Sequence, residues 1–422
     1  MFREAAPPRG LAAAFALLLV AGCSGGSSGG TDGGTDTGGD GDTDADSDAD
    51  SDADTDADSD ADSGVLSCPG QTDAGPWEWE DQPEGEDCGP GCKQITFSNK
   101  VRLASWDVWD DRLAFVDDET RRLWLVDMAE GKQLKVPAVN PELAPEPPLI
   151  TNGFYGPSLF EDQLLHGWWT SFNVPLTQRQ IVLNSTPTVL KVMADWGGID
   201  NDLYENQFVY FRHNSITGEK DLCIGDVENP CEVNVLLASL QYGGAASRIW
   251  KNTLVWVQGK SASSDIQGFD QANESFAEIT SDEYYQIHPR LHERRVVYQD
   301  LRFGDNNPQG NWNHSAVFLY DLDTQQTTQI AGGDWIACNP DVHGDIVVWT
   351  DYRASNDPNN GYDFSGVEIW GYNLATQTEF QVTNIPGRAK AMPRVWGGYV
   401  YVDMAKPGGN AIYRFDLPAE AR

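Results

Sequence analysis

The sequence predicts an all-β fold, a seven-bladed β-propeller whose blades are four-stranded antiparallel sheets. Three observations predict it. One short motif recurs seven times at roughly 45-residue intervals, and each copy contains four short strand-like segments. A segment before the first copy also matches the strand that the last copy lacks. Six and eight blades stay open as alternatives.

The clearest copy of the motif spans residues 339–383. An extended segment at 339–343 is followed by a Gly-Asp turn and an apolar, β-branched strand at 346–351. Alternating segments at 367–374 and 378–383 complete the unit. Every copy shares an aliphatic residue followed by an aromatic residue or histidine, then a polar turn and an apolar triplet. The aliphatic residues are Val108, Leu159, Leu203, Ile249, Leu291, Val342 and Val395.

A single sheet of this kind cannot bury both of its faces, so neighbouring sheets must cover it. The predicted blades are 100–137, 150–193, 196–237, 241–280, 284–331, 335–384 and 388–417. The last blade ends after its third strand, whereas 93–97 resembles a fourth strand such as 380–383. We therefore expect 93–97 to form the outer strand of the last blade and to close the ring.

The N-terminus has the features of a lipoprotein signal peptide. Arg3 and Arg9 flank the start of a short apolar run at 11–20, which ends in Val20-Ala21-Gly22-Cys23. This ending resembles a bacterial lipobox, and the resemblance implies cleavage before Cys23 and attachment of lipid to its sulfur. An ordinary signal peptide is the alternative. Ser24 in place of Asp favours the bacterial outer membrane or cell surface as the location.

The segment that follows cannot fold by itself. It has no apolar residue larger than alanine up to residue 63, and aspartate occupies every even position from Asp40 to Asp62. Repulsion between these charges extends the chain, which suits a tether, and Ca²⁺ binding is the alternative interpretation. The predicted domains are a signal peptide at 1–22, a tether at 23–63, a cysteine-containing lead-in at 64–92 and a propeller at 93–417.

The chain is strongly acidic. It has 28 Lys and Arg against 65 Asp and Glu, a formal net charge of −37. Such a charge opposes binding to nucleic-acid phosphates or to an anionic lipid surface. We therefore expect no nucleic-acid partner, and membrane contact only through the lipid anchor.

Seven cysteines are present, and Cys23 is the predicted lipid site. The even remainder in an exported protein favours disulfides. These candidates are Cys68, Cys88, Cys92, Cys223, Cys231 and Cys338. We expect a local bridge between Cys223 and Cys231 and leave the other pairings open. Cys88-Gly-Pro-Gly-Cys92 is also compatible with half of a zinc site, but no second pair has matching spacing.

The repeat resembles the TolB-like or PD40-type propeller family of exported bacterial proteins. The resemblance rests on residues 347–353 with 369–374 and on 296–302 with 317–322, and it extends over 93–417. It implies a propeller fold and not a particular reaction, and many members have six blades. Two functions follow from it as alternatives, a periplasmic envelope assembly partner like TolB and a glycan-active lyase or hydrolase at the channel mouth.

The residue before each aliphatic position lies on the predicted innermost strand, where it can face a central channel. These positions hold Asp107, Ser158, Asp202, Arg248, Arg290, Asp341 and Arg394. Charges of both signs can bind a small polar ligand there, or they can form ion pairs between blades. We take the six charged members as channel candidates.

Two repeated features are interpreted as structural. His292 and His343 suggest a metal, but the same slot holds Trp, Phe or Tyr in the other copies, so we expect flat packing and no metal site. Asp300 with Arg302 recurs as Asp351 with Arg353, which is typical of a turn held by a carboxylate.

Two long loops at 303–316 and 354–366 are rich in Asn, Asp and Gly and are expected on one face of the propeller. Their binding candidates are Asp305, Asn306, Trp312, Asn356, Asp357 and Asn360. Ca²⁺ is a possible ligand of these oxygen-rich loops, and no other cofactor is expected.

No nucleophile elbow, phosphate loop or zinc-protease motif is present, so no catalytic residue is assigned. The sequence therefore favours a monomeric, membrane-anchored, non-catalytic binding or scaffold lipoprotein. Its loop face is expected to bind a protein or a glycan.

Overall fold

The computed structural model describes most of the chain from residue 78 onward. The described residues are 78–97, 101–120, 122–136, 153–169, 177–182, 190–195, 201–213, 219–227, 233–240, 244–259, 263–304, 314–355, 357, 364, 366–388 and 390–422. All of them belong to a unit made of Met1–Gly25 and Cys68–Arg422, and Gly26–Ser67 is a separate unit. The predicted signal peptide and tether, with Cys23, therefore lie outside the described residues.

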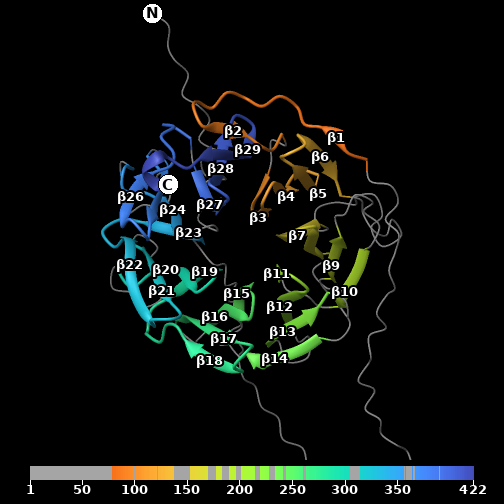
Figure 1. The fold of residues 1–422 in the computed structure, drawn as a ribbon, viewed down its shortest axis with the longest axis vertical. Coiled ribbons are helices and arrows are strands. Elements are labelled where there is room, and N and C mark those ends of the chain that lie inside the picture. Colours follow the sequence, from red (N-terminus) through yellow and green to blue (C-terminus); the bar gives the residue numbers. More distant parts are fainter. Residues whose placement is uncertain are drawn as a thin grey trace, which may run out of the picture. The chain divides into compact units, whose positions relative to one another are not determined.

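The described strands form seven antiparallel sheets around a central axis, the all-β propeller architecture that the repeats predict (Figure 1). The innermost strands are β3 (Val101–Trp109), β7 (Gly153–Phe160), β11 (Asp202–Tyr204), β15 (Gly244–Trp250), β19 (Gln286–His292), β23 (Ala337–His343) and β27 (Lys390–Trp396). Within this described part of the chain, no helix is both long and apolar enough to cross a membrane.

The remaining strands follow outward from each inner strand in chain order. Beyond β3 lie β4 (Arg112–Asp117), β5 (Arg122–Asp127) and β6 (Lys132–Lys135), and beyond β7 lie β8 (Gln163–Trp169), β9 (Thr177–Val182) and β10 (Leu190–Asp195). Beyond β11 lie β12 (Gln207–His213), β13 (Lys220–Asp226) and β14 (Val233–Leu240), and beyond β15 lie β16 (Thr253–Gly259), β17 (Ser264–Asp270) and β18 (Ser275–Glu278). Beyond β19 lie β20 (Arg295–Asp300), β21 (Ala316–Asp321) and β22 (Gln326–Gly332), and beyond β23 lie β24 (Ile346–Asp351), β25 (Glu368–Asn373) and β26 (Thr378–Gln381).

The last sheet contains strands from both ends of the propeller region. Its order is β2-β29-β28-β27, where β2 is Cys92–Gln94, β28 is Tyr399–Lys406 and β29 is Gly409–Asp416. Gln94 pairs with Tyr413, and the backbone N–H of Ile95 donates to the Ile412 carbonyl at 2.9 Å. The predicted closing strand is therefore confirmed. Ile95 and Ile412 also belong to one buried cluster with Val108 of the first sheet, which joins the two ends of the ring.

The lead-in contributes a further strand that the sequence did not predict. Strand β1 (Glu80–Asp81) pairs with β6 and becomes the fifth strand of the first sheet. Lys132 Nζ lies 2.6 Å from Asp81 Oδ1, and Gln133 Nε2 donates to Glu80 Oε1 at 2.6 Å. Because β1 and β2 are consecutive, the lead-in runs from the outer edge of the first sheet to the outer edge of the seventh (Figure 1).

The core lies between the sheets and is built from the apolar triplets of the second strands. The first residues of six triplets are at most 1 % exposed, namely Leu113, Leu164, Phe208, Leu254, Val296 and Val347. Trp256 and Trp349 on the same strands are equally buried, as expected for aromatic residues that fill gaps between sheets. Burial of this surface between neighbours is what makes the repeats cooperate.

The described cysteines include one disulfide, but one disulfide that the sequence predicted is not formed. Cys88 and Cys92 form a disulfide beside the closing strand. Cys223 is a free thiol, so the expected Cys223–Cys231 bridge is wrong. Cys223 faces the core between Tyr210 and Val235, which are its neighbours on β12 and β14, and it is 0 % exposed. Cys338 is buried too, whereas Cys68 and Cys231 lie outside the described residues.

Candidate functional site

A β-bulge in the inner strands determines which side chains face the channel. The pairing register with the second strand shifts within β7, β15, β19, β23 and β27. In each strand the shift lies between the polar residue of the motif and the residue three positions before it. One residue of each bulge has a left-handed backbone with φ between 47° and 53°, namely Gly156, Ala246, His288, Asn339 and Met392. A bulge re-aims the side chains beside it, so the same local device is repeated around the ring.

The aromatic or histidine residues of the motif form a closed ring of side chains that pack against one another at tilted angles, which we call the aromatic ring. Its members are Trp109, Phe160, Tyr204, Trp250, His292, His343 and Trp396, and successive ring centroids are 4.1 to 4.8 Å apart. Trp109 also lies 5.9 Å from Trp250, across the ring. The aromatic ring therefore fills the channel at the end where short turns join the first and second strands.

The two histidines occupy ordinary positions in this aromatic ring, in the packing role that their repeat position predicts. His292 packs against Trp250 and His343, and His343 packs against Trp396, with the ring planes tilted by 47° to 56°. His292 Nδ1 accepts the backbone N–H of Gly344 at 3.1 Å. Burial lowers the pKa of His292 to about 3 and also lowers the pKa of His343, so both rings are neutral at pH 7.

The polar position of the motif lies two residues before the aromatic ring. All six charged channel candidates line one cavity of about 90 Å³, with the aromatic ring as its floor. A second cavity of about 70 Å³ shares Asp107, Asp202, Arg248, Arg290 and Arg394 and adds Trp106, Gly156, Pro157, Ser158 and Asn201. The structure therefore brings the channel candidates together, and it adds Trp106 and Asn201, which no repeat pattern had singled out.

Where the polar position holds an acceptor, it holds the next inner strand in place. Asp107 Oδ2 accepts the backbone N–H of Leu159 at 2.9 Å, and Asp202 Oδ2 accepts that of Ile249 at 2.9 Å. In the same way Ser158 Oγ accepts the backbone N–H of Leu203 at 3.1 Å, and Asp341 Oδ2 accepts that of Val395 at 2.8 Å. These contacts join adjacent sheets by hydrogen bonds, and one ion pair between adjacent sheets is also present, with Arg290 Nε 3.8 Å from Asp341 Oδ1.

In the fourth, fifth and seventh sheets the same position holds an arginine, which has no acceptor atom. Arg248 Nη1 donates to the carbonyl of its own neighbour Ser247 at 2.6 Å, and Arg394 Nη1 donates to the Pro393 carbonyl at 3.0 Å. The Arg394 guanidinium also lies 5.4 Å from the centre of the Trp106 ring. Three guanidinium groups thus surround the cavity.

Burial changes the ionisation of several cavity groups. It raises the pKa of Asp107 to about 6 and that of Asp341 to about 7. It lowers the pKa of His288, which lies beside Arg290 and Arg248, to about 4. Burial, and next the nearby Arg248 charge, lower the pKa of Arg290 to about 10. Arg290 therefore stays charged at pH 7, whereas Asp107 and Asp341 lose charge as the pH falls below 7.

The Asp-x-Arg pairs have the structural role that their recurrence predicts. Asp300 Oδ1 accepts both the backbone N–H and Nε–H of Arg302, at 2.8 and 2.9 Å, and Asp351 does the same for Arg353 at the same distances. Each carboxylate is fully buried while its arginine reaches outward. These pairs fix the point where the second strand enters its long loop.

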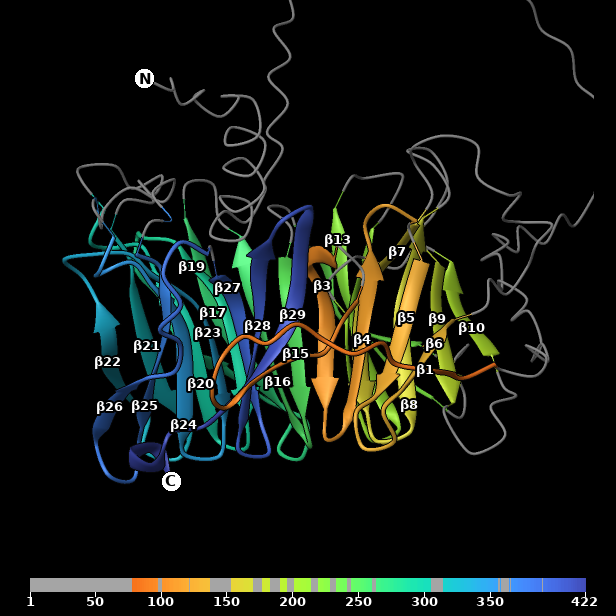
Figure 2. The same cartoon turned by 90° about the horizontal axis from the view of Figure 1, so that it is seen from above.

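The loop candidates are mostly beyond what the structure describes. Asp357 is described and exposed, whereas Asp305, Asn306, Trp312, Asn356 and Asn360 lie outside the described residues. The described ends of both loops follow β20 and β24, at the end of the sheets opposite the aromatic ring. In Figure 2 this end is the upper side, and the 3₁₀ turn η1 (Ala419–Ala421) lies on the lower side.

Comparisons with known proteins find relatives in structure only. No protein-family model matches the chain, and no curated protein matches it. An oligogalacturonate lyase from Vibrio parahaemolyticus is similar with a TM-score of 0.54 and 10% identity, over 82% of this chain and 98% of the lyase. The β-propeller domain of the Trilobed protease from Pyrococcus furiosus is similar with a TM-score of 0.50 and 11% identity, over 64% of this chain and 84% of that domain.

A putative TolB from Agrobacterium tumefaciens is also similar, with a TM-score of 0.40 and 12% identity, over 64% of this chain and 91% of the TolB chain. A TM-score of 0.40 is too low to support an inference from this likeness. The identities of the other two relatives are so low that they show the fold alone. The chain therefore has a β-propeller fold, and its function has to be argued from its own cavity.

Proposed function

We propose that this chain is an exported, lipid-anchored, non-catalytic binding protein built on a closed seven-bladed propeller. Its binding surface is the central cavity together with the long-loop face. The observation that carries the proposal is the cavity: six charged side chains from six different sheets meet beside the packed side chains of the aromatic ring. Ligand sites in proteins are concave, with a few convergent polar groups on a rigid scaffold.

The aromatic ring fills one end of the channel, so we propose that a ligand enters the cavity from the opposite end. Access is from the side that carries the 303–316 and 354–366 loops, which is where functional residues of rigid scaffolds usually lie. A partner that contacts both loops therefore also covers the cavity mouth. A protein or a glycan that spans this face is the partner class that we propose.

Anchoring is tested by Cys23→Ala. The variant should lose incorporation of labelled palmitate and move from the membrane fraction to the soluble fraction, whereas Cys338→Ala should keep the label. Protease treatment of intact cells then separates a surface location, where the wild-type chain is cleaved, from a periplasmic one, where it is protected. Retention of Cys23→Ala in membranes would contradict the lipid anchor.

Partner binding is tested with the full chain immobilised on beads in envelope extract and over a panel of bacterial polysaccharides. Asp357→Arg reverses an exposed charge on the loop side, and Glu420→Arg makes the same change on η1 at the opposite side (Figure 2). We expect Asp357→Arg to weaken a specific interaction about tenfold or more and Glu420→Arg to leave it unchanged. Equal effects of the two variants would show that the loop face is not the binding surface.

The alternative function, a lyase or hydrolase acting on glycans at the channel mouth, rests on the fold shared with an oligogalacturonate lyase. Incubation with acidic polysaccharides decides between the two. Release of unsaturated or reducing ends, abolished by Arg394→Met, would replace the non-catalytic proposal with this one. A periplasmic assembly role like that of TolB would instead appear as protease protection together with capture of envelope proteins.

A further inference from the structure

Among the described buried polar atoms of the cavity wall, those left without a hydrogen-bond partner are all donors. Trp106 Nε1, Arg248 Nε and Arg394 Nε are inaccessible to solvent and have no hydrogen-bond partner among the described residues. All three side chains line the cavity of about 70 Å³, and Trp250 Nε1, in the adjoining cavity of about 90 Å³, is in the same condition. All four atoms are donors. None of the carboxylate oxygens of Asp107, Asp202 or Asp341 is left in this state.

Buried donors without an acceptor are costly, on the order of 1–3 kcal/mol each and more for charged groups. Proteins keep such groups where something else supplies the acceptor. Arg394 is 8 % exposed and Trp106 is 3 % exposed, so bulk water reaches neither side chain freely. The acceptor that is missing must therefore occupy the cavity itself.

The charges around the cavity indicate the same kind of ligand. Arg248, Arg290 and Arg394 come from three sheets, so their guanidinium groups approach the cavity from different directions. Each of the three cavity carboxylates is held by a backbone N–H of the next inner strand, at 2.8 or 2.9 Å. Asp341 also reaches Arg290, whose Nε lies 3.8 Å from Asp341 Oδ1, but the Nε atoms of Arg248 and Arg394 are left without an acceptor among the described residues. Guanidinium groups prefer planar or tetrahedral oxyanions, which they bind in a bidentate manner.

We propose that the cavity binds an oxyanion, a carboxylate, phosphate or sulfate group, between Arg248, Arg290, Arg394 and the Trp106 indole N–H. The combined space, about 90 Å³ and about 70 Å³, exceeds what a single water molecule needs and suits one acid group with a few attached atoms. A larger ligand inserts only its acid group. This inference deepens the proposed function, because it names the chemistry that the binding face recognises.

The test is calorimetric titration of the purified full chain with sodium sulfate, sodium phosphate, sodium acetate and disodium succinate at pH 6 and constant ionic strength. Sodium chloride is the reference for non-specific salt effects. Arg394→Met removes the charge and the donors while keeping a long side chain, and Trp106→Phe removes only the indole N–H. Arg422→Met changes the net charge equally at an exposed site outside the cavity. Circular dichroism checks that each variant is folded.

We expect saturable binding of at least one oxyanion, weakened about tenfold or more by Arg394→Met and several-fold by Trp106→Phe, with Arg422→Met unchanged. Comparison of the anions that bind shows whether the cavity takes a carboxylate, a phosphate or a sulfate group. Two results would overturn the inference: no saturable binding of any of the four anions up to tens of millimolar, or equal binding by wild type and Arg394→Met. Anion binding without any envelope partner would leave this inference standing and reject the partner proposal.

Discussion

The backbone N–H of Ile95 donates to the carbonyl oxygen of Ile412 at 2.9 Å, and this hydrogen bond is one of those that join the beginning of the propeller to its end. The backbone N–H of Ile412 in turn donates to Thr96 Oγ1 at 2.9 Å. The side chains of Ile95 and Ile412 are at most 1 % exposed and pack against Val108 and Leu113 of the first sheet. The closing strand thus contributes both hydrogen bonds and apolar contact to the junction.

The first prediction concerns this junction. Ile95→Ala removes a buried side chain between the first and seventh sheets and should lower the free energy of unfolding by about 2–4 kcal/mol. Lys93→Ala, at an exposed position on the same strand, should change it by less than about 0.5 kcal/mol. Urea denaturation followed by tryptophan fluorescence measures both. If the two variants were equally stable, the closing strand would not contribute to the ring.

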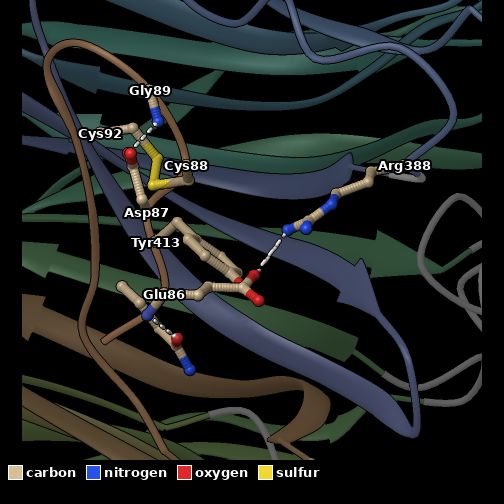
Figure 3. Close-up of a disulfide and its surroundings, with 8 residues drawn as sticks. Glu86, Asp87, Cys88, Gly89, Cys92, Arg388 and Tyr413 are labelled. Carbon is tan, nitrogen blue, oxygen red and sulfur yellow. Dashed lines mark hydrogen bonds and ion pairs between the residues drawn. A yellow bond between two sulfur atoms is a disulfide. The ribbon is translucent and has the colours of Figure 1, made fainter. Parts of the chain in front are cut away.

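The second prediction concerns the Cys88–Cys92 disulfide, which closes a tight loop immediately before β2 (Figure 3). Beside it, Glu86 forms an ion pair with Arg388 at 2.7 Å and accepts a hydrogen bond from the Tyr413 hydroxyl. The bridge limits the freedom of the unfolded chain around this anchor, so the double change of Cys88 and Cys92 to Ser should cost about 2 kcal/mol. Thermal unfolding without reductant should show the loss, and a reductant should then affect the wild type but not the variant.

The third prediction concerns His343 in the aromatic ring. His343→Phe keeps a flat ring between His292 and Trp396, so we expect a stability change below about 1.5 kcal/mol and unchanged ligand binding. His343→Ala leaves a gap in the ring and should cost at least about 2 kcal/mol. Urea denaturation and the anion titration check the pair. A loss of binding in a fully stable His343→Phe would mean that the imidazole has a functional role.

The fourth prediction uses the pKa of Asp341, which burial raises from 3.8 to about 7. Since the folded chain holds this proton more tightly than the unfolded chain, stability is greatest below pH 4 for this group and declines as pH rises toward 7. Asp341→Asn removes the ionisation and keeps an oxygen for the Val395 N–H. The variant should therefore gain stability relative to wild type, by a few kcal/mol at most, as pH rises from 4 to 8. A constant difference across this range would show that Asp341 does not titrate abnormally.

The same carboxylates make the anion titration dependent on pH. The cavity is lined by Asp107, Asp202, Asp341 and the three arginines, with His288 close to Arg248 and Arg290, and burial raises the pKa values of Asp107 and Asp341 to about 6 and about 7. Their protonation removes negative charge beside the bound anion, whereas burial keeps His288 neutral down to a pKa of about 4. Affinity for an oxyanion should therefore rise between pH 8 and pH 5.5, and Asp341→Asn should flatten that rise.

Much of this molecule could be predicted from the sequence, because its repeats carry the information locally. Each strand is identified by its own alternation and turn residues, so the sheets, the closing strand at Ile95 and the polar and aromatic positions of the inner strands followed from pattern alone. The stacking role of His292 and His343 followed in the same way, from what the other repeats place in that slot. Positions that vary from repeat to repeat carried no such signal. Trp106 was therefore not placed at the channel, although Asp107, one residue later, was.

Other features depend on contacts between segments that are distant in the chain. Strand β1 has only two residues, and the edge of the first sheet, not its own sequence, makes Glu80 and Asp81 extended. The direction of Cys223 depends on which face of β13 is covered, and the sheet turns it into the core rather than toward a partner cysteine. By itself the sequence determined the repeating unit and the closure of the ring, since both can be recognised from short-range patterns of apolar, polar and turn residues. Only the tertiary structure decided which donors in the channel lack an acceptor, because that depends on how side chains from different sheets meet at the axis.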